Sequence, residues 1–350
     1  MAPDHRPPPP CRGRGVRVAL LHDGGSDEWS AADVAAVLAN IQEIEEILKA
    51  AGHTTEAVPV YLADLNWLDR CQKADLIFNL CEGINGHARF EDYVVAALEL
   101  TRVPFTGCRS WPITICHRKH VANTLLQEAG LPVPAFALVH EPVVPKGLRL
   151  PVIVKPAMED ASVGIDEGSV CYTEDALLER LAKLTATWED VLVQEYVPGR
   201  EFNVGFVGTT VLPISEIDFA GLGEGKPPIV TYAAKWTAGS DYDLHTIPVC
   251  PAKVDEATAE MLVSVAERTW RALAKCEGYG RVDLRLDADG MPWVIELNPD
   301  PDLSSDAGLA RMGQAFGWDY SALVLQVAEE ALERGRVALA EGALAGRVTS

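Results

Sequence analysis

The sequence predicts an α/β protein, and three observations lead to that fold class. Short apolar runs typical of strands alternate with amphipathic helical patterns through the first 107 residues. Helices rather than tight turns separate these strands, which is typical of βαβ units in a parallel sheet. Beyond residue 190, strands follow one another through short turns, so the C-terminal part is expected to be α+β.

The N-terminal elements follow in chain order. Residues 1–15 contain Pro, Arg and Gly with nothing to bury, and are expected to form a disordered lead. A strand in "VRVALL" precedes a helix that ends at Gly52, and "TEAVPV" is the next strand. The strand "DLIFNLCEG", the helix "FEDYVVAALEL" and the strand "VPFTG" repeat the alternation. The apolar stripe of the first helix consists of Val34, Val37, Leu38, Ile41, Ile44 and Leu48.

Two acidic residues, Glu28 and Glu82, follow the ends of strands in this part. Because the carboxyl ends of parallel strands form the ligand edge of such a sheet, either residue could contact a substrate. Acids after a strand are more often helix caps or solvated loop residues, so both interpretations stay open.

The middle of the chain contains a strand that ends in a lysine. A helix is expected from Thr114 through Lys119 to Gly130, and "LPVPAFALV" leaves it as an extended segment. In "LPVIVKPAMEDASVGI" an apolar strand ends at Lys155, and Ser162 lies in the loop that follows. Such a loop can place backbone N–H groups and a hydroxyl along phosphate oxygens. The spacing of a P-loop is missing, and a lone lysine at a strand end is commonly a surface charge.

Further strands and two long helices are expected in the C-terminal half. "VLVQEYVPGREFNVGFVG" predicts two strands around Pro198-Gly199, and "SEIDF" and "IVTYAAKW" predict two more. "VDEATAEMLVSVAERTWRALAKCEG" predicts an amphipathic helix that ends at Gly278, and an Ala- and Glu-rich helix begins near Ser321.

The hairpin of "RVDLRLDADGMPWVIELNPDPD" brings charged side chains together. If Asp289-Gly290 forms a two-residue turn, Asp283 lies opposite Glu296 and Arg281 lies opposite Asn298, all on one face.

Two carboxylates directly opposed on paired strands repel each other, so they favour a cation between them or a proton on one of them. A hard ion such as Mg²⁺ takes oxygen ligands of this kind. The alternative is a solvated ladder of charges that Arg281 and Arg285 neutralise, and for the hairpin alone it stays open.

The composition excludes several classes of protein. The chain has 350 residues, 48% of them apolar, which is enough for two or three domains. Its formal charge of −21 argues against nucleic acid or an anionic membrane as the main partner. No apolar run approaches the ~18 residues of a membrane span and no secretory signal is recognisable, so a cytoplasmic location is expected. The eight cysteines lack metal-ligand spacing and are expected to be reduced and packed.

Four segments together resemble the ATP-grasp superfamily, in an order and spacing similar to those of D-alanine–D-alanine ligases. They are "VIVKPAMEDASVG", "VLVQEYVPGREFNVGFVG", "YGRVDLRLDADG" and "VIELNPDPDLSSDAG". Four ordered motifs are far more specific than one. The resemblance covers most of the chain and implies an ATP-grasp fold preceded by a Rossmann-like N-terminal domain. The implied units are residues 16–107 (N-terminal), 108–193 (central), 194–333 (C-terminal, with the metal and oxyanion site) and 334–350 (a helical tail).

The resemblance also implies which residues bind ATP and metal. ATP phosphates would contact Lys119, Lys155 and Lys235, and Ser162 with its loop would cover them. The adenine hinge would consist of Gln194, Glu195, Tyr196 and Val197, and Glu201 would hold the ribose. Mg²⁺, as two ions and with Mn²⁺ as an alternative, would be held by Asp283, Glu296 and Asn298. Arg281 would stabilise the developing oxyanion, and Glu28 would face the amino group of the first substrate.

The implied activity is that of an ATP-dependent carboxylate–amine ligase. ATP phosphorylates a carboxylate, an amine attacks the acyl phosphate, and an amide forms with release of ADP and phosphate. The implied substrates are small and amino-acid-like, and the resemblance implies a homodimer.

Several substrate positions depart from the family pattern. Asp302 replaces a glycine, Ala161 replaces the first of two serines, and Trp236 replaces a tyrosine of the lid. The segment "NLCEGINGHARFEDY" lacks an expected histidine. Because an Asp at position 302 adds negative charge near the carboxylate of the second substrate, the hypothesis is that the acceptor is not D-alanine, or not only D-alanine.

Two other functions compete with the active ligase. One is a non-catalytic ATP-binding regulatory protein, against which Arg281 argues because ATP binding alone needs no oxyanion donor. The other is an ATP-grasp kinase that stops at phosphoryl transfer. ADP release that depends on substrate separates the enzymes from the regulatory protein, and an amide product separates the ligase from the kinase.

Overall fold

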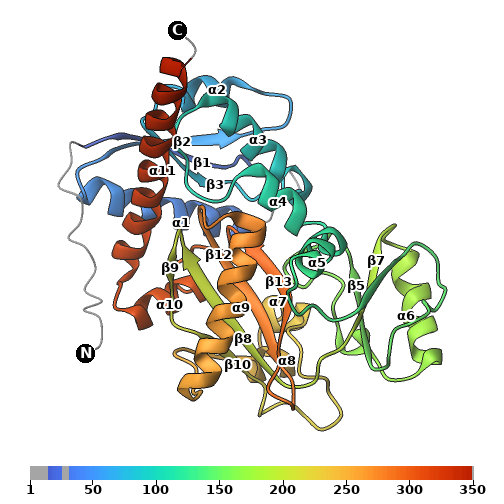
Figure 1. The fold of residues 1–350 in the computed structure, drawn as a ribbon. Helices are drawn as coiled ribbons and strands as arrows, with labels where there is room; N and C mark the ends of the chain where they lie inside the picture. The colour runs from blue at the N-terminus through green and yellow to red at the C-terminus, as the bar shows by residue number, and fades with distance from the viewer. Residues whose placement is uncertain (1–14, 26–30, 349–350) are drawn as a thin grey trace.

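A three-stranded parallel sheet forms the N-terminal part of the protein (Figure 1). The computed structural model describes residues 15–25 and 31–348. The strand order is β2-β1-β3, with β1 Arg17–Asp23, β2 Thr54–Val60 and β3 Leu76–Leu80. The helices of this part are α1 Ala31–Ala50, α2 Asn66–Cys71, the short 3₁₀ turn η1 Ala88–Phe90 and α3 Glu91–Thr101. The predicted alternation of strand and helix and the parallel pairing are confirmed.

Two details of this part differ from the prediction. Val34 and Leu38 of the expected apolar stripe are exposed, whereas Ile41, Ile44 and Leu48 are buried. The segment "VPFTG" is not a strand, since it pairs with β3 only through a single bridge at Phe105. Residues 1–14 of the predicted lead of residues 1–15, and the predicted substrate residue Glu28, lie outside the described residues.

The middle of the chain forms a separate four-stranded sheet in the order β4-β7-β5-β6. The strands are β4 Phe136–Val139, β5 Val152–Pro156, β6 Val170–Cys171 and β7 Val191–Glu195. The 3₁₀ turn η2 Glu167–Ser169 precedes β6, and helix α6 Glu174–Thr185 packs on this sheet. Leu177, Leu181 and Leu184 of α6 form a core with Val152 and Val154 of β5.

The helix expected from Thr114 to Gly130 is two helices, α4 Ser110–Cys116 and α5 Lys119–Glu128. Arg118 has non-helical backbone angles, and the backbone N–H of Lys119 donates to the carbonyl of Ala157 at 3.0 Å. This long-range hydrogen bond ties the start of α5 to the end of β5, so the break places Lys119 beside Lys155 rather than inside a continuous helix.

The C-terminal part is built on an antiparallel sheet in the order β11-β10-β8-β12-β13, with β9 paired to β8. The strands are β8 Arg200–Val207, β9 Thr210–Val211, β10 Ser215–Asp218, β11 Ile247–Val249, β12 Tyr279–Leu286 and β13 Pro292–Pro299. The helices are α7 Tyr232–Trp236, α8 Asp241–His245, α9 Glu256–Ala274, α10 Gly308–Phe316 and α11 Tyr320–Val348. None of the helices in the described ranges is both long and apolar enough to cross a membrane.

The strand predicted for "IVTYAAKW" is wrong, because this segment forms helix α7. The Thr231 hydroxyl accepts a hydrogen bond from the backbone N–H of Ala234, which is the usual cap of a helix start. The Ala-Ala-Lys that follows favours a helix when no neighbouring strand offers a partner. The predicted domain boundaries at residues 107, 193 and 333 stay predictions, and α11 runs without a break across residue 333.

The hairpin of β12 and β13 has the predicted register at its charged end. Asp283 pairs with Glu296, and Arg281 pairs with Asn298. The two-residue turn is wrong. Asp287 donates its backbone N–H to Met291, so the loop is Ala288, Asp289 and Gly290, and the pairing shifts by one residue at a bulge between the turn and the acidic pair.

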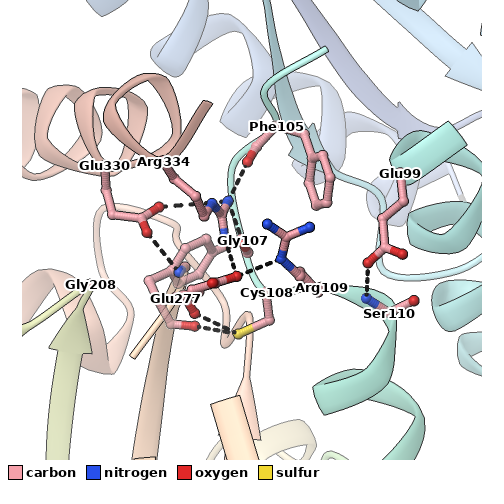
Figure 2. A network of polar contacts seen from close by, with 12 residues as sticks. Glu99, Phe105, Gly107, Cys108, Arg109, Ser110, Gly208, Glu277, Glu330 and Arg334 are labelled. Carbon is pink, nitrogen blue, oxygen red and sulfur yellow. Dashed lines mark hydrogen bonds and ion pairs between the residues drawn. The ribbon is translucent and has the colours of Figure 1, made fainter. Parts of the chain in front are cut away.

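Helix α11 connects the C-terminal part to the N-terminal part (Figure 2). Arg334 Nη2 donates to the carbonyl oxygens of Phe105 (2.6 Å) and Gly107 (2.9 Å). Glu330 accepts from the backbone N–H of Gly278 at 3.0 Å, just before β12 begins. Arg109 forms an ion pair with Glu277 at 2.5 Å. These contacts hold the segment after β3 against the start of β12.

Candidate nucleotide and metal site

A cavity of about 280 Å³ opens between the middle sheet and the C-terminal sheet. Strands β5 and β7 of one sheet and β8, β12 and β13 of the other contribute to its wall. Of the predicted site residues, the structure brings these to the cavity: Lys155, Ser162, Gln194, Glu195, Tyr196, Val197, Glu201, Lys235, Arg281, Asp283 and Glu296. Lys119 and Asn298 lie directly behind this wall, in contact with Glu296 and Asp283.

Lys155 is a buried cation with no anionic partner in the part of the chain that the structure describes. Its side chain is 4% exposed, and it forms no hydrogen bond or ion pair among the residues described. Burial lowers its pKa, and the charge of Glu296 offsets that effect only in part. Because an unpaired buried charge is unfavourable, this ammonium group is suited to an anion that arrives from outside the protein.

Lys119 starts α5 and is buried close to Glu296. Its Nζ donates to Asp160 Oδ1 and to the carbonyl of Glu159, both at 2.7 Å, and it approaches Glu296 Oε2 at 3.7 Å. Burial opposes its charge, but Glu296 and Asp160 outweigh burial and raise its pKa.

The acidic pair at the hairpin is surrounded by cations. Arg281 holds Asp283 through two hydrogen bonds, Nε to Oδ1 at 2.7 Å and Nη2 to Oδ2 at 2.8 Å. Burial disfavours the Glu296 carboxylate, but the charges of Lys119, Lys155 and Lys235 outweigh burial and lower its pKa to about 2. Glu296 is therefore held in the ionised form at neutral pH.

The oxygen atoms at this end of the hairpin fit a hard divalent ion. Glu296 accepts no hydrogen bond from a described residue, so its oxygens are open to a ligand. Asn298 turns its Nδ2 toward Asp283 at 2.8 Å, which leaves its amide oxygen free. In the described ranges, no three His, Cys, Asp or Glu side chains form a group able to hold a metal. A metal here would thus depend on the Asn298 amide and on phosphate oxygens in addition to the two carboxylates.

Arg285 is a site residue that the sequence analysis did not identify. It is 3% exposed and joins the predicted hinge to the predicted ribose residue. Its Nη1 donates to Tyr196 Oη (3.0 Å) and to the carbonyl of Val197 (3.1 Å), and its Nη2 donates to Glu201 Oε2 (2.7 Å) and to the carbonyl of Pro228. The signal was present in the sequence, since Arg285 follows Arg281 and Asp283 at the period of two that shares a face.

The hinge itself presents unused polar groups. Gln194 is 1% exposed, and its Nε2 is buried without an acceptor among the residues described. Glu195 turns its carboxylate away to Arg149, with Oε2 2.9 Å from Arg149 Nη2. Glu195 would therefore contact a ligand through its backbone, whereas the Gln194 side chain retains an N–H donor for a ligand.

The loop after β5 contacts helix α7 at the edge of the cavity. Ala161 and Ser162 both have positive φ angles, 52° and 63°, which turn the chain sharply over the end of β5. Trp236 of α7 donates its indole N–H to the carbonyl of Ala161 at 3.2 Å. Trp236 thus connects α7 to this loop through its ring nitrogen, at the position where the resemblance implies a tyrosine.

Comparisons with known proteins agree with this architecture. Residues 125–329 match the family model described as "D-ala D-ala ligase C-terminus". The chain is 31% identical to a D-alanine–D-alanine ligase of Alcanivorax borkumensis over 91% of this chain and 95% of that protein. The chain belongs to the D-alanine–D-alanine ligase family. Membership makes it an ATP-grasp carbon–nitrogen ligase, in a family that uses ATP and a divalent metal ion.

The fold of this D-alanine–D-alanine ligase family member is also that of solved structures. Two structures of a Bacillus anthracis D-alanine–D-alanine ligase, one of them with ATP, superpose with TM-scores of 0.69 and 0.72 at 20% and 22% identity. Each covers 92% of this chain and 99% of the other chain. The predicted ATP-grasp fold is confirmed. Another relative, described as uncharacterized protein y4sG of Sinorhizobium fredii, is 36% identical over 74% of this chain and 75% of that protein.

The segment after β13 contains Asp302, one of the positions that depart from the family pattern. Asp302 is exposed, and its carboxylate accepts from the backbone N–H (2.9 Å) and the hydroxyl (2.8 Å) of Ser304. These contacts hold the acidic group in place of the glycine that the family pattern has at this position.

Proposed function

We propose that this protein uses ATP to phosphorylate a substrate carboxylate and then joins the acyl group to an amine, with release of ADP and phosphate. One observation carries the proposal. The buried and unpaired Lys155 faces Glu296, with Arg281 and Asp283 on the same strand face, inside a cavity that two sheets enclose. A site of this kind supplies the two requirements of phosphoryl transfer, positioning and charge neutralisation.

ATP would lie with its base at the hinge and its phosphates at the lysines. The hinge of residues 194–197 offers the buried Gln194 amide to the base. Arg285 holds only Oε2 of Glu201, so Oε1 is open for a ribose hydroxyl. Lys155 and Lys235, which have no ion pair among the described residues, would bind the phosphates together with the backbone of the Ser162 loop.

Asp283, Glu296 and Asn298 would hold Mg²⁺, as two ions in our proposal. When bound, the metal supplies charge neutralisation at the phosphate oxygens. The protein's own part is to keep Glu296 ionised, which the surrounding lysines do, and to hold Asp283 in place, which the bidentate contact of Arg281 does.

Arg281 is proposed to serve the second step, attack by the amine. The carbon under attack becomes tetrahedral and its oxygen gains negative charge, which fixed donors stabilise. Arg281 is on the cavity wall, and the charge of Asp283 raises its pKa against the effect of burial, so it stays a cation throughout. Glu28, proposed to bind the amino group of the first substrate, lies outside the described residues.

The amine acceptor is proposed to differ from free D-alanine. Asp302 places a carboxylate where the family pattern has glycine, and like charges at that position disfavour a substrate α-carboxylate. The family resemblance also supports small amino-acid-like substrates, a cytoplasmic location and a homodimer. Light scattering of the purified protein would test whether it is a dimer.

The test is an ADP-release screen of the pure protein with MgATP and pairs of amino and hydroxy acids. We expect ADP release that depends on both substrates, and an amide product by mass spectrometry. ADP release without an amide would support a kinase instead, and no substrate-dependent release with any pair would contradict the proposal. Robust synthesis of D-alanyl-D-alanine would contradict the proposal on the acceptor alone.

A further inference from the structure

Arg180 is a buried arginine of helix α6 that does not line the nucleotide cavity. Its side chain is 5% exposed, and its guanidinium group donates only to the segment between β5 and β6, residues 157–169, which we call the β5 loop. Nη1 donates to both carboxylate oxygens of Asp166, at 2.8 and 2.9 Å. Nη2 donates to the carbonyl of Gly164 and to the hydroxyl of Ser169, both at 2.7 Å. A single side chain therefore holds the β5 loop at three points.

Asp166 fixes the end of the β5 loop and is contacted by two cations. Its carboxylate accepts from the backbone N–H of Gly168 at 2.9 Å, which caps the turn η2. Burial opposes its charge, but the hydrogen bonds from Arg180 and Lys183 outweigh burial and lower its pKa. Lys183 is 66% exposed and contacts only Oδ2 of Asp166, at 3.1 Å. Of the two cations, only Arg180 also reaches the rest of the loop.

The carbonyl that Arg180 holds belongs to the second of two successive turns. The backbone N–H of Val163 donates to the carbonyl of Asp160 at 3.0 Å. The backbone N–H of Ile165 donates to the carbonyl of Ser162, also at 3.0 Å. The C=O and N–H of a trans peptide point in opposite directions. Holding the Gly164 carbonyl toward α6 therefore directs the Ile165 N–H back to Ser162 and closes the second turn.

These turns leave backbone donors open beside the nucleotide cavity. The N–H groups of Ala161, Ser162 and Gly164 donate to no residue in the described part of the chain. Ser162 and Ile165 line the cavity. Successive backbone N–H groups of a turn can form a concave site for an anion. Arg180 thus supports, from a position off the cavity wall, a turn with three free donors.

The β5 loop also holds helix α7, which contains Lys235 of the cavity wall. The carbonyl of Ile165 accepts from the backbone N–H of Tyr232, the first residue of α7, at 2.9 Å. At the other end of α7, Trp236 donates its indole N–H to the carbonyl of Ala161 at 3.2 Å. Both ends of the short helix are therefore tied to the loop that Arg180 holds.

We propose that Arg180 is a positioning residue for the phosphates of the nucleotide. It contacts no substrate itself and acts by keeping the β5 loop in the turn that offers its N–H groups. The inference rests on the proposed use of ATP. A role confined to the stability of the middle sheet would change the free energy of unfolding alone. Positioning predicts, in addition, a loss of affinity that is limited to ligands with phosphate groups.

Calorimetry on the full chain with MgATP and with adenosine, which lacks all three phosphates, separates these roles. We expect the wild-type protein to bind MgATP much more tightly than adenosine. Arg180→Met should weaken MgATP about tenfold or more, because the released loop must then be ordered when the phosphates bind. Its affinity for adenosine should stay that of the wild type. Lys183→Met is the matched control, since it removes a cation from the same carboxylate and the same helix but touches neither Gly164 nor Ser169; it should change neither affinity.

Arg180→Lys keeps the test decisive if Arg180→Met does not fold. It retains a cation beside Asp166, but one ammonium group lacks the planar fork that reaches Asp166 and Gly164 together. We expect a thermal midpoint closer to wild type than that of Arg180→Met, and still a selective loss of MgATP affinity.

Three results would overturn the inference and leave the ligase function standing. They are equal losses for MgATP and adenosine, no loss in a folded Arg180 variant, and a loss in Lys183→Met as large as in Arg180→Met. A wild-type protein that binds MgATP no more tightly than adenosine would contradict the nucleotide site itself, and the inference with it.

Discussion

Arg285 should be among the most sensitive positions of the nucleotide site. Its side chain is 4% exposed, and its partner Glu201 is 15% exposed, so Arg285→Met leaves a nearly buried carboxylate without its cation. Breaking a buried ion pair in this way costs about 3–5 kcal/mol. The carbonyl oxygens of Val197 and Pro228 lose a donor as well, while the length and apolar stem of methionine limit the cavity that forms.

Urea denaturation, followed by circular dichroism and tryptophan fluorescence, measures this loss for Arg285→Met. We expect the free energy of unfolding to fall by about 3–5 kcal/mol, and the KM for ATP to rise because the hinge loses the side chain that positions it. The double variant Arg285→Met/Glu201→Leu should recover part of the lost stability, since it removes the stranded charge.

The control is Arg70→Met, in an ion pair whose acid is exposed. Arg70 is 36% exposed and pairs at 2.7 Å with Glu56, which is 59% exposed, so its loss should change stability by about 1 kcal/mol or less. Two results would refute the view that Arg285 organises the hinge. One is a free energy of unfolding of Arg285→Met within about 1 kcal/mol of wild type. The other is a double variant whose loss of stability equals the sum of the losses of its single variants.

Three further predictions concern the charged groups of Lys155, Glu296 and Asp300. Lys155→Met should raise the KM for ATP about 100-fold or more without loss of fold, since the Lys155 side chain forms no hydrogen bond or ion pair with a described residue; steady-state kinetics and circular dichroism measure the two effects. Glu296→Ala should abolish ADP release while circular dichroism stays that of the wild type, and surviving activity would contradict the metal assignment. The pKa of Asp300 is raised to about 8 by burial and by Glu91. The folded state therefore binds a proton that the unfolded state has lost, and stability should fall as the pH rises from 5 through 8, by at most about 1.4 kcal/mol per pH unit. Chemical denaturation across that range should show a shallower fall in Asp300→Asn, and an equal slope in both proteins would contradict the assignment.

The sequence predicted the acidic hairpin correctly through two errors that cancel. A two-residue turn and an unbroken ladder place Asp283 opposite Glu296. The structure has a loop one residue longer than predicted and a bulge at Ile295, and each shifts the register by one residue. Hydrophobic alternation predicts on which face of the sheet a side chain lies, but it does not reveal a bulge. Here the longer loop shifts the pairing by one residue, and the bulge shifts it back, so that Asp283 again lies opposite Glu296.

Other features depend on contacts between distant segments and could not be predicted from local patterns. The break before Lys119 requires the carbonyl of Ala157, and the role of Arg285 requires the carbonyl of Pro228. The helix at Tyr232–Trp236 begins with Tyr and follows a run of Ile, Val and Thr. Such residues favour a strand, but this segment has no strand to pair with in the described sheets. Propensity is a weak prior when tertiary contacts decide the outcome.

The charges of the nucleotide site explain why its metal and its phosphates would have to bind together. Before any ligand is present, Asp283 accepts hydrogen bonds from Arg281, Asn203 and Asn298, and Glu296 is surrounded by Lys119 and Lys155. Phosphates alone would draw the lysines away and leave Glu296 without its compensating charge. A metal ion alone would add positive charge beside lysines that already lack a partner. Only the combination leaves each carboxylate and each lysine with an opposite charge, because the anion takes Lys155 while the cation takes Glu296. The same reasoning explains why Lys155 can be buried without a partner in the free protein: the nearby Glu296 reduces the unfavourable effect of burial without forming a contact that a phosphate would have to break.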